Sequence, residues 1–148
     1  MSYTNKFFVD SCIFIENFKR NGIPEAKAIW NEILRNFKEN DFFVNLIVKN
    51  EVVYHLFVKK KLMTIKELKL LLNSFENLFI TPEIEKDLFK IVEKHNLKPN
   101  DALILATCKH YGIKYLISID TDFPTPCQKE GIVLINSVEK LKEILEKQ

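Results

Sequence analysis

The stretch KYLISIDTDFPTP, residues 114–126, leads from a short apolar run directly into two acidic residues, Asp120 and Asp122. Its apolar part is rich in the aromatic and β-branched residues that favour strands. A second stretch, KFFVDSCIFI at residues 6–15, has the same plan, because its apolar run leads into Asp10. A single acid after a strand often only completes a turn. Two strands that each end in a carboxylate instead suggest a shared functional edge.

Short apolar runs alternate with helical patterns along the rest of the chain. We expect strands at residues 6–10, 42–45, 77–81, 115–119 and 131–136. We expect helices at residues 12–20, 24–38, 47–60, 64–75, 83–95 and 99–112, with a last helix after Ser137. Strands separated by helices are typical of an α/β fold with a mainly parallel sheet. The sequence therefore predicts one domain, residues 1–148, around a five-stranded sheet.

Two further acids lie where a charge is costly. Glu51 lies in the predicted helix 47–60 among apolar neighbours, and Asp101 lies directly before the apolar run ALILA. A carboxylate beside a core-facing run is expensive to bury unless it is paired or bound to a cation. In parallel α/β sheets, ligands bind beyond the carboxyl ends of the strands, where Asp10 and Asp120 are expected. If strands 6–10 and 115–119 are neighbours, these two acids face each other.

Each acid also has a local explanation. Asp10 could cap the helix that follows it, and Asp120 could form an Asx-turn. Asp101 could complement the positive end of its helix, which stabilises a helix by about 0.3–1 kcal/mol. Glu51 could lie on a solvent face. All four acids at one sheet edge, or on a helix entering it, nevertheless favour a common site.

Gathered carboxylates raise each other's pKa values and stay ionised together only with a compensating cation. Their hard oxygen ligands suit Mg²⁺ or Mn²⁺ better than zinc. A bound ion of this kind lowers the pKa of a water molecule and stabilises charge on a phosphate group. His55, one turn after Glu51, is the nearest histidine in the sequence, and we leave it out of the predicted metal site.

Composition excludes several other classes of protein. With 47% hydrophobic and 28% charged residues, the chain is ordinary for a globular domain. It has no apolar run of the ~20 residues that a membrane helix needs, and its N-terminal sequence lacks the features of a signal peptide. We therefore expect a cytoplasmic protein with no membrane partner. Three glycines are too few for a glycine-rich phosphate loop.

Four segments, in this order and spacing, resemble the PIN-domain ribonucleases, including VapC-type toxins. They are FFVDSCIFIENF, LIVKNEVVYHL, LKPNDALILATCKHYGIKYLISIDTDF and GIVLIN. The resemblance implies a three-layer α/β/α domain with a central, mainly parallel five-stranded sheet. It also implies a pocket with one or two Mg²⁺ or Mn²⁺ ions and endonucleolytic hydrolysis of RNA.

The resemblance assigns catalytic and metal-binding roles to four residues: Asp10, Glu51, Asp101 and Asp120. Asp122 matches an accessory acid that some members carry, as a further metal ligand. One position departs from the family, which usually has Ser, Thr or Asn two residues after the first acid. This chain has Cys12 there, with the hydroxyl one position earlier at Ser11. A thiol is a weaker hydrogen-bond partner than a hydroxyl.

The expected partners are an RNA substrate, an antitoxin protein and a second copy of the chain. Ser11, together with Lys59, Lys60 and Lys61, is assigned to substrate binding, since clustered lysines attract a polyanion. The same lysines could instead be a solvated helix end. The helix 64–75 has more apolar residues than one core stripe requires, so we expect part of it to form a homodimer or antitoxin contact.

Three alternatives remain to be weighed. ISIDTDFPT resembles the opening motif of haloacid-dehalogenase-like phosphatases, but that family needs a hydroxyl residue where Pro124 lies and a much longer following chain. A response-regulator receiver needs an acidic pair after its first strand and a lysine after its last, and neither is present. The third alternative is a non-catalytic PIN-like module that binds RNA or protein, with a vestigial acidic pocket.

Overall fold

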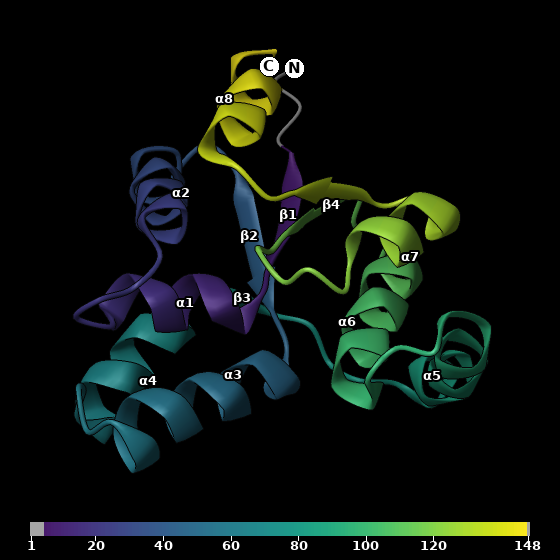
Figure 1. Ribbon diagram of the computed structural model, residues 1–148, viewed down its shortest axis with the longest axis horizontal. Helices are drawn as coiled ribbons and strands as arrows, with labels where there is room; N and C mark the ends of the chain where they lie inside the picture. Colours follow the sequence, from purple (N-terminus) through teal and green to yellow (C-terminus); the bar gives the residue numbers. More distant parts are fainter. Residues whose placement is uncertain (1–4, 148) are drawn as a thin grey trace.

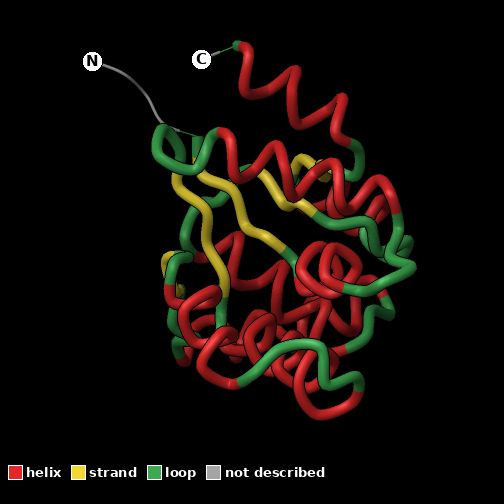
Figure 2. The backbone as a smooth tube through the Cα atoms, turned by 90° about the vertical axis from the view of Figure 1, so that its left-hand side faces the viewer, coloured by secondary structure: helices red, strands yellow, loops and turns green. Residues whose placement is uncertain are grey.

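The computed structural model describes residues 5–147 and contains one five-stranded, all-parallel sheet. The strands lie in the order β3-β2-β1-β4-β5. Their bounds are Lys6–Val9 (β1), Asp41–Val44 (β2), Glu76–Asn77 (β3), Tyr115–Ile117 (β4) and Val133–Ile135 (β5). Figure 2 shows the strands running side by side. The predicted α/β class and parallel sheet are confirmed.

Helices cover both faces of the sheet. The α-helices are Ser11–Phe18 (α1), Pro24–Arg35 (α2), Leu46–Val53 (α3), Ile65–Asn73 (α4), Pro82–His95 (α5), Pro99–His110 (α6), Pro124–Glu130 (α7) and Val138–Glu146 (α8), with a π-helical segment, η1, at Tyr54–Lys59. Figure 1 shows α1 to α4 on one side of the strands and α5 to α7 on the other, and α8 packs on α2. This is the three-layer α/β/α arrangement that the resemblance implied.

The central strand β1 brings the two acid-bearing strand ends together. β1 pairs with β2 on one side and with β4 on the other. Beyond the last pair, the backbone N–H of Asp10 donates to the carbonyl of Ile117 at 3.0 Å. Asp10 therefore lies beside the end of β4, as expected for neighbouring strands.

Apolar side chains from both faces of the sheet form the core. Phe7 and Phe8 on β1 are fully buried, and the Phe7 ring stacks on Phe42 of β2 and Tyr115 of β4. Aromatic pairs of this kind contribute beyond the area that they bury. Cys108 of α6 is also fully buried in this core.

A buried polar link joins the two helices that carry Glu51 and Asp101. Asn45, fully buried, caps α3 by accepting a hydrogen bond from the Val48 N–H at 3.1 Å. Its amide also donates to the Thr107 hydroxyl on α6 at 3.2 Å. Because a buried amide is costly without partners, this link fixes how α3 and α6 sit relative to each other.

The structure differs from the prediction at three elements. The strand expected at 77–81 is only Glu76–Asn77, and Phe79 beyond it is 74% exposed, because this edge strand has no outer partner. The helix expected at 47–60 changes from α-helical to π-helical after Val53. The helix α7 was not predicted. It begins at Pro124, where a proline suits a first turn, and ends at Gly131 with φ 74°.

No helix in residues 5–147 is both long and apolar enough to cross a membrane. Among these residues the longest helix is α5, with 14 residues. A membrane-spanning helix needs ~20 predominantly apolar residues. The helices of this chain have the lengths of helices that cover a sheet.

Candidate active site

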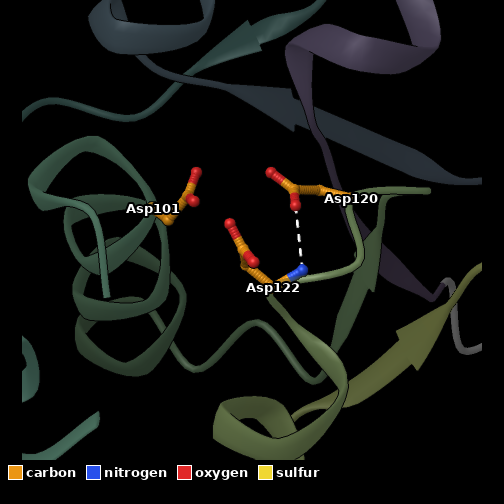
Figure 3. Close-up of side chains that lie close together, drawn as sticks. All are labelled: Asp101, Asp120 and Asp122. Atoms are coloured by element: carbon orange, nitrogen blue, oxygen red, sulfur yellow. Dashed lines mark hydrogen bonds between the residues drawn. The ribbon is translucent and has the colours of Figure 1, made fainter. Parts of the chain in front are cut away.

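Three carboxylates converge at the end of β4. Asp101 lies in the first turn of α6, and Asp120 and Asp122 lie in the loop between β4 and α7. One oxygen of each lies within 4.8 Å of the others. Figure 3 shows the three side chains pointing toward one another. The start of α6 and the loop after β4 therefore bring three acids to one point, and Asp10, which the strand-end argument paired with Asp120, is not among them.

The loop after β4 is held by its own hydrogen bonds. The Asp122 N–H donates to Asp120 Oδ1 at 2.9 Å, shown as the dashed line in Figure 3. The Asp120 N–H donates to the Ser118 hydroxyl at 3.1 Å. Asp120 therefore makes the Asx-turn that its position allowed. This turn engages one of its oxygens and leaves the carboxylate aimed at Asp101.

Asp10 is buried and its two oxygens have separate partners. Oδ1 accepts from the Ser11 N–H at 2.8 Å, so Asp10 caps α1. Oδ2 accepts from the Ser118 hydroxyl at 2.7 Å and from the Cys12 thiol at 3.5 Å. Asp10 is not one of the three acids that converge within 4.8 Å. It is held at the rear of the same site by its neighbours.

A single cavity nevertheless contains most of the predicted residues. It has a volume of about 340 Å³. Its lining residues are Asp10, Ser11, Cys12, Ile15, Glu16, Lys19, Glu51, His55, Lys59, Lys60, Asp101 and Asp120. The four acids predicted as catalytic thus line one hollow, together with two of the three lysines predicted to bind substrate.

Three predicted residues are placed differently from the others. Asp122 approaches Asp101 and Asp120 but lines a neighbouring cavity. Lys61 does not line the acidic cavity and instead borders an apolar hollow beside α4. Ser11 lines the acidic cavity but is itself buried, and its hydroxyl donates to Asp10 Oδ1 at 3.5 Å. The structure therefore gives Ser11 a contact with an acid at the edge of this cavity.

Burial and mutual repulsion disturb the acids strongly. The pKa of Asp101 is raised to about 7, first by burial and then by the charges of Asp120, Asp10, Glu51 and Asp122. The pKa of Glu51 is also raised, by burial and by Asp10, although its Ser11 hydrogen bond opposes the shift. Burial likewise raises the pKa of Asp10, against the hydrogen bond from Ser118. The site therefore holds more negative charge than its protein partners compensate.

The donor set fits a divalent cation. Asp101 Oδ2 is buried and accepts no hydrogen bond among the described residues. Buried polar atoms of this kind are rare in proteins and require an explanation. A hard cation held by carboxylate oxygens would satisfy this atom and offset the repulsion among the acids.

Ser118 supplies the hydroxyl that Cys12 lacks. The Cys12 sulfur lies 3.5 Å from Asp10 Oδ2 and 3.4 Å from the Ser118 hydroxyl. Burial and the charge of Asp10 raise the thiol pKa well above its ordinary value, so Cys12 stays neutral. The sequence analysis missed Ser118. Its signal was a polar residue inside the apolar run YLISI, two positions before Asp120.

Basic residues also line the acidic cavity. Lys19 contacts Glu16 at 3.1 Å, and Lys59 and Lys60 lie at the end of η1. The pKa of His55 is lowered by burial and by these three lysines. Acids and cations therefore share one cavity, an arrangement that can receive a phosphate group.

The chain is similar in sequence to known proteins. A family model described as PIN domain matches residues 7–128. Ribonuclease VapC2 of Methanocaldococcus jannaschii is 37% identical over 134 residues, which cover 80% of this chain and 87% of that protein.

Solved structures show the same fold. VapBC2 from Rickettsia felis, bound to a DNA fragment from its promoter, has a TM-score of 0.67 at 17% identity, over 89% of this chain and 98% of that chain. VapC20 from Mycobacterium tuberculosis, a sarcin-ricin loop cleaving toxin, has a TM-score of 0.65 at 18% identity, over 86% and 96% of the two chains. At such identities the likeness concerns the fold alone.

Proposed function

This chain belongs to the PIN-domain family, and we propose that it is a divalent-metal-dependent endoribonuclease that hydrolyses phosphodiester bonds of RNA. The observation that carries the proposal is the convergence of Asp101, Asp120 and Asp122, with Asp101 Oδ2 buried and without a hydrogen-bond donor among residues 5–147. A vestigial pocket would not need to retain unpaired carboxylates at this cost.

We assign the ion, Mg²⁺ or Mn²⁺, to Asp101, Asp120 and Asp122, whose oxygens already approach one another. Asp10 and Glu51 border the same cavity and complete the predicted ligand set. When bound, such an ion supplies a water molecule of lowered pKa and stabilises negative charge on the phosphate. The number of ions is not part of the proposal.

The chain's own residues then have distinct tasks. Glu51, whose pKa is raised by burial and by the charge of Asp10, is suited to accept a proton from the attacking water. The hydroxyls of Ser11 and Ser118 hold Asp10. Lys59 and Lys60 line the same cavity and pair with phosphate groups of the strand. Ser11 also lines this cavity and keeps its predicted contact with the substrate.

Cleavage of single-stranded RNA tests the proposal. The purified protein should cut RNA with Mn²⁺ or Mg²⁺ and stop when EDTA removes the ion. Asp101→Asn or Asp120→Asn should abolish cutting, because each removes an anionic ligand without changing the size of the side chain. Asp87→Asn on α5, outside the acidic cavity, is the matched control and should cut like the wild type. If wild-type protein leaves RNA intact, or the Asp120 variant cuts equally well, the assignment is wrong.

We also propose an antitoxin partner, as the VapBC structures suggest, and a homodimer. Apolar side chains are exposed along η1, α4 and the segment between them, including Val58 at 55%, Leu62 at 45% and Leu70 at 68%. Light scattering of the protein, alone and with the product of a neighbouring gene, measures both associations. Leu62→Glu should weaken at least one of them. A monomer that no neighbouring product changes would contradict this proposal.

A further inference from the structure

We propose that a second cavity, beside Asp122, binds a phosphate of the RNA strand that flanks the scissile one. This inference rests on the proposed function and extends its substrate site. The cavity has a volume of about 490 Å³. The residues that matter to the argument are Lys94, Asn96, Lys98, Thr121, Thr125 and Lys129. It lies between the end of α5 and the beginning of α7.

The position of Asp122 connects this cavity to the acidic one. Asp122 lines the second cavity, and its carboxylate lies within 4.8 Å of Asp101 and Asp120. Asp101 and Asp120 in turn line the first cavity, which Lys59 and Lys60 also line. The three acids therefore lie between two lysine-bearing cavities. If an RNA strand bound one phosphate in each cavity, the phosphate between these two would lie next to the three acids.

The charge of the second cavity favours an anion. Three lysines line it against one acid, Asp122. The Lys98 ammonium lies 3.7 Å from Asp122, and its side chain is 79% exposed, so this pair is loose. In the proposed function Asp122 holds a cation, which leaves Lys98 available to another anion. Lys129 is exposed at the end of α7 and forms no ion pair among residues 5–147.

A cluster of ion pairs and hydrogen bonds around the buried Glu130 side chain holds the walls of the cavity together. Glu130, with a side chain only 5% exposed, binds Lys94 at 2.9 Å and His95 at 2.6 Å on α5. It also binds Lys109 on α6 at 2.7 Å. One carboxylate thus fixes α5, α6 and the end of α7 against one another. Such preorganisation lowers the cost of binding, because the lysine-bearing backbone is already in place.

An RNA backbone fits this chemistry better than a base does. Lysine binds phosphate as a point charge, and contacts to phosphate position a strand without reading its sequence. The threonine hydroxyls and the Asn96 amide add neutral hydrogen-bond donors to the same cavity. We therefore assign the cavity to a backbone phosphate, and Lys98 and Lys129 to its recognition.

Binding of a short fluorescein-labelled single-stranded oligoribonucleotide of mixed sequence, measured by anisotropy with Mg²⁺, tests the assignment. All proteins carry Glu51→Gln, which prevents cleavage but keeps the three converging acids. Removing one phosphate contact to a single strand reduces the salt slope of log K by about 0.7. Lys98→Gln with Lys129→Gln should therefore make the slope less negative by about 1.4. Lys142→Gln on α8, which lines neither cavity, should not change it.

Cleavage kinetics of the same lysine variants in an otherwise wild-type chain separate the two proposals. We expect a higher KM with kcat retained, because the contact lies away from the reacting phosphate. An unchanged slope and KM in a protein that cleaves RNA would overturn the second cavity and leave the nuclease standing. If the slope depends on the lysines but the wild-type protein cleaves no RNA, the second cavity stands and the proposed nuclease function is overturned. No binding by the parent protein at low salt would also overturn the cavity assignment.

Discussion

Among the acids of the site, Asp101 shows most clearly that burial and repulsion destabilise an ionised carboxylate. Its pKa of about 7 in the folded protein exceeds its ordinary value of 3.8. A raised acid pKa destabilises the fold where the unfolded chain is ionised, so the penalty is complete above about pH 7. It is relieved as the pH falls from about 7 to about 4.

We therefore predict that the metal-free protein melts at a higher temperature near pH 5.5, roughly the middle of this window, than near pH 8, above it. Asp101→Asn should reduce the difference, because the amide has no charge to relieve. Calorimetry in EDTA at both pH values measures it, with Asp87→Asn as control. If the melting temperatures of wild type and the Asp101 variant depended equally on pH, the ionised Asp101 would not be what destabilises the fold.

Single residues also mark the limit of the sequence analysis. Asp10, Glu51, Asp101 and Asp120 could be found because each is a charge beside an apolar run. Their roles relative to one another could not, since these depend on which oxygens converge. Ser118 was missed because a serine after a strand core is common. Only the packing of β4 on β1 shows that its hydroxyl reaches Asp10.

At the scale of elements, α7 matters because its last residue ties three helices together. Lys94, His95 and Lys109 surround Glu130, and the pKa of this acid is lowered to about 2, first by the hydrogen bond from Lys109. A lowered acid pKa stabilises the fold above the unfolded value near 4.5 and is lost as the pH falls toward about 2. This window lies below that of Asp101, so the two effects can be separated.

We predict that Glu130→Gln destabilises the protein at neutral pH by on the order of 1–2 kcal/mol, because solvent screens the pairs with the half-exposed Lys94 and Lys109. Urea unfolding at pH 7 measures the loss. The exposed Glu143→Gln on α8 is the control and should change stability by less than about 0.5 kcal/mol. A loss for Glu130→Gln no larger than that of the control would show that the cluster is only a surface contact.

Elements with strong local signals were predictable and those set by tertiary context were not. The helix at Pro99 had a proline start and a glycine after its end, and it was found nearly to the residue. The strand at 77–81 was overestimated, because apolar residues at a sheet edge need no partner strand. The helix α7 was hidden by two prolines in one turn, which on sequence grounds favour a loop.

At the scale of the molecule, the strand order explains why the acids meet. The chain winds from β1 to β2 with α1 and α2 on one face, and it reaches β4 with α5 and α6 on the other (Figure 1). The winding therefore reverses between β1 and β4, where α/β sheets open a crevice at their carboxyl ends. Asp10 and Asp120 border that crevice, and α3 and α6 deliver Glu51 and Asp101 to it.

Paired thermal melts test directly whether this crevice binds a metal ion, and they require no knowledge of the RNA. Wild type and Asp120→Asn are each melted with EDTA and with Mn²⁺. At ~100 times its dissociation constant, the ion should stabilise wild type by about 2.7 kcal/mol, or roughly 5–10 °C. Asp120→Asn should melt no lower than wild type in EDTA, because one repelling charge is gone, and should respond less to Mn²⁺. No Mn²⁺ response in wild type, or an equal response in the variant, would contradict the account.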